Sequence, residues 1–489
     1  PMVVAGVMLV FQRRYVVGGI LTMIAAALEI QANHFQMTYY LLLLLLIVGG
    51  FYTFQFIKEK SYKELGKSVL VFIIAGILAI GANATNLLAT SEYAKFSTRS
   101  NSELSYDADG KKKESNNAMS YEYITEYSYG KAESLNLLAP RIFGGSNHED
   151  LGVDSEMYKY ITAQGVPPYE AVNLVKQMPT YWGDQPIVAA PAYIGIIVFF
   201  FAVLSFFDDK KKINYILLAG VLFSLFLSWG KNFSFLTDFF IDYVPMYNKF
   251  RAVSSIQVLL ELCMPVLAVL GFYNFFKMED EKKWDALWKT GTIVIGVLVL
   301  LLFFKSLFDF SGVNDGYYLQ SYGPEFMQAL KEDRSSLYTS DVFRSIMLVI
   351  AVFGILYLYI KKTFKPFVAV VLVGVLMCGD LFFIAKNYVN KESFVSANEM
   401  EVPFQPSTAD MQILQDTTHY RVFEVVGNMS NARTSYFHKS IGGYHAAKPR
   451  KMQQLFDYQI AKNNVGVLNM LNVKYIIQSN EQGQQFAMN

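Results

Sequence analysis

The chain has 489 residues, of which 42 are Lys or Arg and 41 are Asp or Glu, so its formal net charge at pH 7 is +1. Hydrophobic residues make up 53% and charged residues only 17%, whereas soluble globular domains carry about 25% charged residues. This composition excludes a disordered, collagen-like or coiled-coil protein, and no basic excess points to a nucleic-acid partner. The two cysteines, Cys263 and Cys378, lie inside apolar runs, which excludes a disulfide framework and a cysteine-based zinc site.

Long apolar runs dominate the sequence. A helix needs about 20 apolar residues to cross the hydrocarbon core of a bilayer. Residues 1–11 have the pattern of the inner end of a crossing, and 15–30 is a short candidate that ends at a polar turn. Together with eight full-length candidates, these two segments predict a mainly α fold. The fold would be a polytopic transmembrane helical bundle of about ten spans. The full-length candidates are 36–57, 68–89, 187–207, 213–230, 254–276, 290–308, 342–360 and 366–385.

Lys and Arg are unevenly distributed over the short loops between these runs. One alternate set of loops holds 16 Lys and Arg in 36 residues, and the other set holds 6 in 64. Because cytoplasmic loops carry the excess of positive charge, the first set is predicted to be cytoplasmic. The protein is therefore expected in the inner (cytoplasmic) membrane, with large segments outside the cytoplasm. The first set is 12–14, 58–67, 208–212, 277–289 and 361–365, and the second is 31–35, 231–253 and 309–344.

These patterns divide the chain into four predicted parts. Residues 1–90 are transmembrane helices, 91–186 an extracytoplasmic loop domain, 187–386 further transmembrane helices, and 387–489 an extracytoplasmic α+β domain. The last part mixes strand-like runs with a helical stretch; these are 420–426, 473–478 and 450–461. Residues 324–334 open with Pro and predict a short amphipathic helix on the outer surface. The chain begins and ends abruptly, so we expect the first helix to be cut and the last domain to be incomplete.

Polar side chains gather at the predicted outer boundary of the membrane. Glu29, His34 and Gln36 lie around one tight turn between two spans, and Lys249 and Arg251 lie on a loop that ends at the same boundary. Cations there suit a lipid-phosphate headgroup, because Arg offers two parallel hydrogen bonds to phosphate oxygens. Glycosyl transfer also needs a carboxylate that deprotonates the acceptor hydroxyl, and Glu29 is the candidate within this chain.

For each of these candidate site residues, a structural role is an alternative to the functional one. Arg251 has the position of an interfacial anchor, His34 that of a helix cap, and Asp184, in a Trp-Gly-Asp sequence, that of a turn residue. Glu29 lies one helical turn inside the boundary, where an unpaired charge costs several kcal/mol, so a paired structural role and a catalytic role are both open. No metal-binding or nucleotide-binding motif is visible, and the sequence identifies no cofactor, leaving a divalent cation open.

Several stretches are similar to the YfhO family of bacterial membrane proteins, which resembles the GT-C class of polytopic glycosyltransferases. The similarity extends over nearly the whole chain, and it is more specific for the family than for a substrate. The similarity is clearest in residues 243–251 (Tyr-Val-Pro-Met-Tyr-Asn-Lys-Phe-Arg) and in residues 434–445, which end in Ile-Gly-Gly-Tyr-His. The other similar stretches are 34–40, 127–133, 137–145, 182–186, 228–232 and 471–475.

The resemblance implies an enzyme of the cell envelope. GT-C enzymes take a sugar from a polyprenyl-phosphate donor and transfer it to an acceptor outside the cytoplasm, here an envelope glycan or lipid. Their acidic catalytic residue lies in the first extracytoplasmic loop, which is expected upstream of Pro1. By this resemblance, Arg251 is the best candidate for a contact with the donor phosphate, and Lys249 is the second. His34 and Gln36 would line the outer cavity, and Asp184 would lie at the same boundary.

Two other functions remain open from the sequence. A flippase or transporter of lipid-linked sugars would need ionisable side chains in mid-membrane, and the spans hold few of them: Glu261, Lys305 and Asp380. A non-catalytic envelope-assembly protein would bind partners through its outer domain. In all three cases membrane lipids are the surrounding partners.

Overall fold

The computed structural model describes residues 1–112, 119–207, 212–445, 447–480 and 485–488. It consists of two compact units, and each unit is formed by two segments of the chain. Unit 1 comprises Pro1–Asn83 and Glu122–Asn390, and unit 2 comprises Ala84–Tyr121 and Lys391–Asn489. The units thus group the chain differently from the four predicted segments, because the predicted loop domain 91–186 contributes to both of them.

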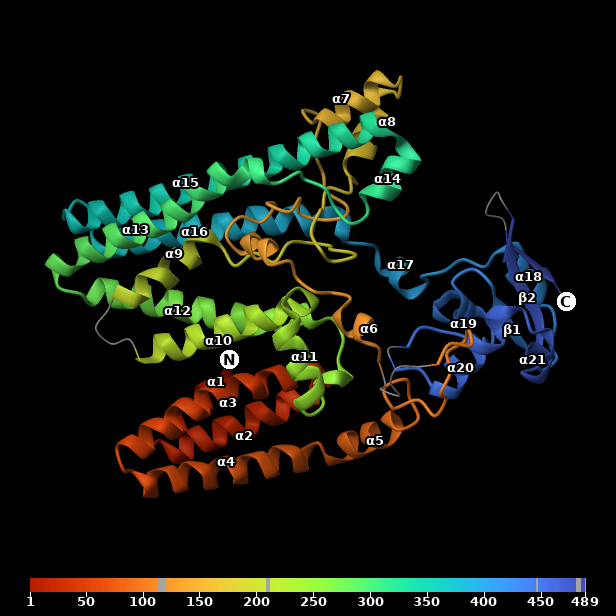
Figure 1. Cartoon of the computed structure of the whole chain (residues 1–489), viewed down its shortest axis with the longest axis horizontal. Helices are drawn as coiled ribbons and strands as arrows, with labels where there is room; N and C mark the ends of the chain where they lie inside the picture. Colours follow the sequence, from red (N-terminus) through yellow and green to blue (C-terminus); the bar gives the residue numbers. More distant parts are fainter. Residues whose placement is uncertain (113–118, 208–211, 446, 481–484, 489) are drawn as a thin grey trace. The chain divides into compact units, whose positions relative to one another are not determined.

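Unit 1 is helical, and the described residues contain six helices that are long and apolar enough to cross a membrane (Figure 1). An additional pair, bent by 112° between its halves, raises the number to seven if it forms one span. The mainly helical fold is confirmed, whereas ten spans are not, since three of the predicted ten are shorter apolar helices. The six are α3 (Phe35–Lys58), α4 (Tyr62–Ala82), η5 with α12 (Val253–Lys277), α13 with η6 (Asp280–Leu307), α15 (Pro324–Ile360) and α16 (Pro366–Tyr388). The bent pair is α10 (Lys212–Ser228) with η3 and α11 (Gly230–Tyr243), and the shorter helices are α1 (Met2–Phe11), α2 (Tyr15–Gln31) and α9 with η2 (Ile196–Phe207).

The predicted span 187–207 is helical only in its second half. Gly195 has φ +92°, a conformation outside the helical region, and α9 begins at the next residue. Pro186 and Pro191 precede it and have no backbone N–H for a helical hydrogen bond. The helical part therefore has 12 residues, too few for a full crossing. Of the predicted loop 208–212 that follows, residues 208–211 lie outside the described part of the chain.

Helix α15 has 37 residues and includes two elements that were predicted to be separate. The predicted surface helix 324–334 continues without a break into the predicted span 342–360. Its start is fixed by Gly323, with φ +88°, and by Pro324 at the first helical position. Polar residues in the middle of α15, among them Asp333, Arg334 and Asp341, are buried rather than exposed, which ties the N-terminal half of the helix to the loops around it.

Arg334 of α15 is the largest fully buried side chain of the described residues. Its guanidinium forms an ion pair with Asp315 of α14 (Asp315–Tyr322), at 2.8 Å between Nη1 and Oδ2. It also donates to the backbone carbonyls of Thr180 and Phe310, each at 2.9 Å. One side chain thus joins α15 to the loop before α14 and to the segment before residue 182.

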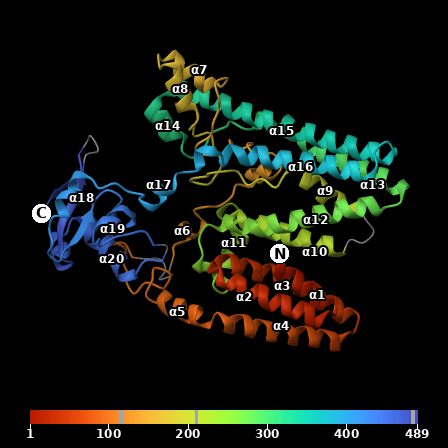
Figure 2. The same ribbon diagram turned by 180° about the vertical axis from the view of Figure 1, so that it is seen from behind.

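The main core of unit 1 lies among α9, α13 and α15, and α13, α15 and α16 run side by side in both views (Figures 1 and 2). Fully buried Val, Leu, Ile and Phe side chains from these helices fill it. The loop segments 138–143 and 181–182 pack on the same core, so they are held firmly. The remaining elements of unit 1 are α6 (Tyr121–Thr125), η1 (Ala132–Leu137), α7 (Glu156–Ala163), α8 (Pro168–Val175) and η4 (Tyr247–Lys249).

Unit 2 contains a three-stranded sheet in the order β1-β2-β3. Strand β1 (Arg421–Glu424) pairs in parallel with β2 (Val473–Ser479), and β3 (Gln485–Met488) is antiparallel to β2. The two strands and the helix that the sequence placed here are present, and β3 was not predicted. The short helices of unit 2 are α5 (Ala84–Ala94), η7 (Lys391–Ser393), α17 (Ala397–Glu401), α18 (Thr408–Ile413), η8 (Asn428–Ser430), α19 (Arg433–Phe437), α20 (Arg450–Tyr458), η9 (Ile460–Lys462) and α21 (Val465–Met470).

Candidate functional site

The loop that carries Lys249 and Arg251 has a strained backbone. Met246 has φ +67° and Ala252 has φ +56°, and both are in the left-handed region that residues with a Cβ rarely adopt. Each such residue costs on the order of 1–3 kcal/mol and persists only where its surroundings impose the conformation. Strain of this kind clusters at binding sites, so the loop 245–252 with its two strained residues is a candidate binding loop.

Two hydrogen bonds hold this loop against the start of α3. Tyr39 Oη donates to the carbonyl of Pro245 at 2.9 Å, and Gln36 Nε2 donates to the carbonyl of Arg251 at 2.7 Å. Gln36 Nε2 also donates to Tyr40 Oη at 2.8 Å, which fixes the amide. The predicted site residue Gln36 therefore positions the backbone of Arg251, another predicted site residue.

A cavity of about 330 Å³ lies beside this loop, between α2 and α3. Its wall is apolar, formed by Ile, Leu and aromatic side chains, and Phe250 and Met246 of the loop close one side. Glu29 of α2 reaches this wall half-buried, and its Oε1 accepts a 3.4 Å hydrogen bond from Thr38 Oγ1. Glu29 thus has a polar partner, Thr38, at the wall of the cavity.

The guanidinium of Arg251 lies outside the cavity wall but next to Phe250. Its Nη1 donates to Tyr123 Oη at 2.9 Å, and the group lies 5.1 Å from the centre of the Tyr123 ring. No carboxylate of the described residues forms an ion pair with it, so its charge is available to an anion. Lys249 lies half-buried at the end of η4, two residues before it.

His34 and Asp184 have different surroundings. His34 is exposed at the N-cap position of α3, yet its side chain makes no capping hydrogen bond, so it remains near Gln36 as a surface group. Among the described residues, Asp184 forms its hydrogen bonds with partners outside the Arg251 loop. Its Oδ2 accepts from Asn232 Nδ2 at 2.9 Å, and its backbone N–H donates to Glu133 at 3.4 Å.

Glu133 is the centre of this second cluster. It is 1% exposed and accepts hydrogen bonds from Tyr181 Oη at 2.6 Å, from the Gly130 N–H at 2.9 Å and from Gln185 Nε2 at 3.2 Å. Burial raises the pKa of the Glu133 carboxyl above its ordinary value. The cluster joins three of the stretches that carry the family resemblance, 127–133, 182–186 and 228–232. Sequence reasoning selected these stretches but not Glu133, whose importance depends on contacts made by residues about 50 positions away.

A third cluster forms around Arg141, whose side chain and backbone N–H both bind Asp341. Its Nη2 contacts Asp341 Oδ1 at 2.6 Å, its Nε lies 3.2 Å from the same oxygen, and its backbone N–H donates to Oδ2 at 2.9 Å. Gly144 makes this turn possible, since its φ is +85° and a Cβ there would lie 2.0 Å from the carbonyl oxygen of Thr180. Arg141 is therefore a structural cation rather than a ligand for phosphate.

Glu149 neighbours this ion pair and is 3% exposed. Its Oε2 accepts from Ser146 Oγ at 3.0 Å, and its Oε1 accepts from Tyr388 Oη at 3.2 Å and lies 3.9 Å from Arg141 Nη1. Burial raises its pKa from 4.5 to about 7, although the nearby Arg141 charge acts in the opposite direction.

The raised pKa predicts a pH-dependent stability. The stability contributed by the neutral Glu149 carboxyl is complete below about pH 4.5 and is lost as the pH rises through 7, because the folded protein must then bury a charge. In Glu149→Gln, the free energy of unfolding should fall less between pH 4.5 and 8, by on the order of 3 kcal/mol. Thermal unfolding in detergent across this range measures the effect, with the exposed Glu170→Gln as control. Parallel pH curves for wild type and Glu149→Gln would contradict it.

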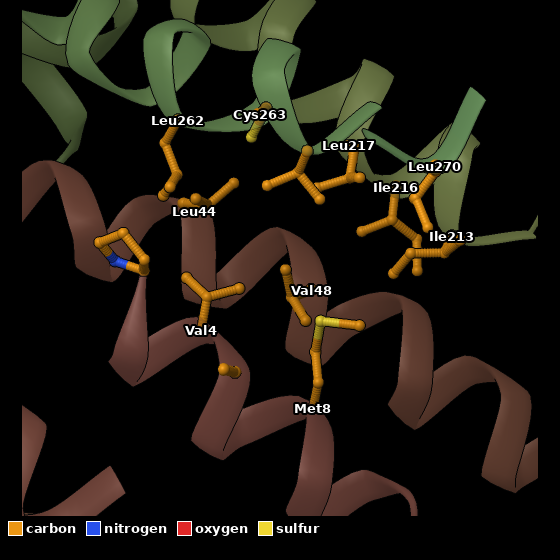
Figure 3. Close-up of a pocket in the computed structure, with 13 residues that line it drawn as sticks. Val4, Met8, Leu44, Val48, Ile213, Ile216, Leu217, Leu262, Cys263 and Leu270 are labelled. Atoms are coloured by element: carbon orange, nitrogen blue, oxygen red, sulfur yellow. The ribbon is translucent and has the colours of Figure 1, made fainter. Parts of the chain in front are cut away.

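A separate cavity of about 300 Å³ lies between the N-terminal helices and α10 and α12. In Figure 3, Val4, Leu44 and Val48 point from α1 and α3 toward Leu262 and Leu217 on the opposite helices. Every side chain around it is apolar apart from the thiol of Cys263. This cavity suits a hydrocarbon chain, but it has no group that could orient a headgroup. Of these two cavities, the one at Glu29 is therefore the candidate site.

In the described part of the chain, no three His, Cys, Asp or Glu side chains come together as a group that could hold a metal ion. Comparison with protein-family models, with curated proteins and with solved structures finds no match to this chain. The assignment to the YfhO family remains a prediction from the sequence.

Proposed function

We propose that this chain belongs to a GT-C-like glycosyltransferase of the cytoplasmic membrane. In this proposal it transfers a sugar from a polyprenyl-phosphate donor to a cell-envelope acceptor on the outer face. The observation that carries the proposal is the cavity at Glu29, whose wall is apolar and whose neighbouring loop carries Arg251. A lipid-linked sugar has the same division, with an apolar chain next to an anionic phosphate and a polar sugar.

Each part of such a donor has a partner at this site. The polyprenyl chain would lie against the Leu and Ile side chains of α2 and α3, and the phosphate would meet Arg251. Charge-assisted hydrogen bonds from a guanidinium to phosphate are roughly twice as strong as neutral ones. The hydrogen bond from Gln36 to the Arg251 carbonyl would hold the backbone in place, and the one from the guanidinium to Tyr123 Oη would hold the cation, so little ordering would remain for the binding step.

The proposed reaction needs one base and one counter-charge. Glu29 takes the proton from the acceptor hydroxyl, and the acceptor oxygen forms a bond to the anomeric carbon of the sugar. The bond from this carbon to the phosphate oxygen breaks, and the polyprenyl phosphate leaves with its additional negative charge offset by Arg251. An acidic residue upstream of Pro1, as the family resemblance implies, is the alternative base.

Replacing Arg251 by Ala tests the donor site. In lipid nanodiscs, the wild-type protein should bind undecaprenyl phosphate more tightly than undecaprenol. Arg251→Ala should weaken binding of the phosphate by about tenfold to a hundredfold, as expected for a hydrogen bond to a charged group. Native mass spectrometry at several lipid concentrations measures both affinities.

Arg14→Ala is the matched control, because Arg14 is an exposed arginine at the opposite end of α2. It should leave the preference for the phosphate unchanged. Equal binding of phosphate and alcohol by the wild type would contradict the donor site. If labelled donor were moved across a reconstituted membrane with its sugar still attached, the flippase would be the better interpretation.

A further inference from the structure

Unit 2 contains a polar groove beside α20, which we call the α20 groove. Helix α20 turns Met452, Leu455 and Phe456 toward the core of unit 2. Its opposite face lines a cavity of about 400 Å³ together with the segment 98–109. This volume lies within the range of small-molecule sites. Of the nine residues around the cavity, only Ala108 lacks a polar side chain.

Arg450 is fixed in the wall of this groove. Its Nε donates to Ser100 Oγ at 3.0 Å, and its Nη2 donates to the carbonyl of Thr98 at 2.9 Å. Among the described residues, no carboxylate forms an ion pair with it, and its Nη1 makes no hydrogen bond. A guanidinium held at two nitrogens, with the third one directed to no protein partner, is a donor already ordered for a ligand.

Acceptors lie opposite and beside this donor. Gln453 Nε2 donates to Asp457 Oδ1 at 2.8 Å, which leaves the second Asp457 oxygen and the Gln453 carbonyl oxygen for other partners. On the segment across the groove, Asp107 Oδ1 accepts from the backbone N–H groups of Asp109 and Lys111 at 3.0 and 2.7 Å. The groove therefore presents a fixed donor together with several fixed acceptors at one small site.

The charge balance restricts what can bind there. Three carboxylates, Asp107, Asp109 and Asp457, line the groove together with one guanidinium, and the Lys462 ammonium donates to the backbone carbonyl of Ala108 beside it. Because the carboxylates outnumber these two cations, a phosphate or another anion is disfavoured. These carboxylates do not form a group that could hold a metal ion, in the part of the chain that the structure describes. A neutral molecule with adjacent hydroxyl groups fits best, because each hydroxyl both donates and accepts.

We propose that the α20 groove binds an uncharged hexose unit of a glycan. The choice of a glycan rests on the proposed glycosyl transfer, whereas the position and polarity of the site rest on unit 2 alone. The hydroxyls of the sugar would accept from Arg450 Nη1 and donate to Asp457 and Asp107. The Tyr458 ring is half-buried at the edge of the groove and would cover an apolar face of the sugar ring.

Saturation-transfer NMR on the whole chain in nanodiscs tests this binding directly. The probes are the methyl glycosides of glucose, galactose, mannose and N-acetylglucosamine. At least one should receive saturation from the protein, and methyl glucuronide should bind at least tenfold more weakly than its neutral counterpart glucose, because of the three carboxylates. Gln453→Ala and Asp457→Asn should each weaken binding of the preferred glycoside by tenfold or more.

The exposed Gln415→Ala in the same unit is the control and should bind as the wild type does. Arg450 is left unchanged, because its removal would also free the segment 98–100. The proposal is overturned if none of the four glycosides binds, if both groove variants bind as tightly as the wild type, or if CaCl₂ binds in the groove and the glycosides do not. Binding of undecaprenyl phosphate involves unit 1 and is measured separately, so failure of one site is distinguishable from failure of the other.

Discussion

Replacing Arg334 by Met is expected to lower the free energy of unfolding by about 3–5 kcal/mol, the range for breaking a buried ion pair. Met fills a similar volume, so packing is nearly preserved. The change leaves Asp315 without its cation and removes the donors to the carbonyls of Thr180 and Phe310. Buried acceptors without a donor carry the full cost of their lost hydration. Thermal unfolding of the purified protein in detergent measures the loss.

Gln328→Met is the matched control for this experiment, because Gln328 lies on the same helix and is exposed. It should change the free energy of unfolding by no more than about 0.5 kcal/mol. If Arg334→Met unfolded at the same temperature as the control, the guanidinium would have no net role in stability. Such a result would mean that the desolvation of the ion pair costs as much as its hydrogen bonds contribute.

Glu29→Gln should abolish most of the proposed transferase activity. A general base contributes about 10²- to 10⁴-fold to the rate, and Gln cannot accept the proton, although it keeps the hydrogen bond with Thr38. Binding of undecaprenyl phosphate should stay the same or become tighter, because a negative charge beside the phosphate has been removed. Sugar transfer from a synthetic polyprenyl-phosphate sugar to envelope lipids, followed by mass spectrometry, measures the rate.

Glu59→Gln provides the comparison, since Glu59 is exposed at the opposite end of α3. It should keep both the rate and the affinity. If Glu29→Gln transferred sugar at the wild-type rate, Glu29 would not be the base, and another carboxylate would have to act. A rate loss accompanied by an equal loss of donor binding would instead assign Glu29 to the binding of the donor.

The long helices of unit 1 could be predicted because the requirement of a bilayer is local. Some 20 consecutive apolar residues are visible in the sequence, and α3, η5 with α12, and α16 begin and end close to the predicted residues. Helix α4 lies six to seven residues earlier than the predicted span 68–89. The number of spans was overestimated where backbone conformation overrides composition, as at Gly195. The pairing of the segment before residue 121 with the last hundred residues has no local signal, so unit 2 could not be predicted.

The candidate site was predictable in its residue types but not in its contacts. The boundary turn suggested Glu29 and Gln36, and the 243–251 stretch suggested Arg251. The hydrogen bond between Gln36 and Arg251 joins residues 215 positions apart, which no periodicity indicates. Asp184 has the same polarity and the same expected depth, yet it belongs to the Glu133 cluster, because its partner Asn232 and the Gly130 turn hold it there.

The two-segment construction of unit 2 has a consequence during synthesis. The contact between Arg450 and Thr98 joins residues 352 positions apart, so the ribosome must make all the helices of unit 1 in between before α20 exists. At 5–20 residues per second, this interval lasts roughly 20–70 s. Throughout it, the segment 84–112 lacks its partners in the last hundred residues, and it must remain soluble and uncleaved. The segment is rich in polar residues, several of which later line the α20 groove. Such a stretch has little tendency to aggregate during this interval.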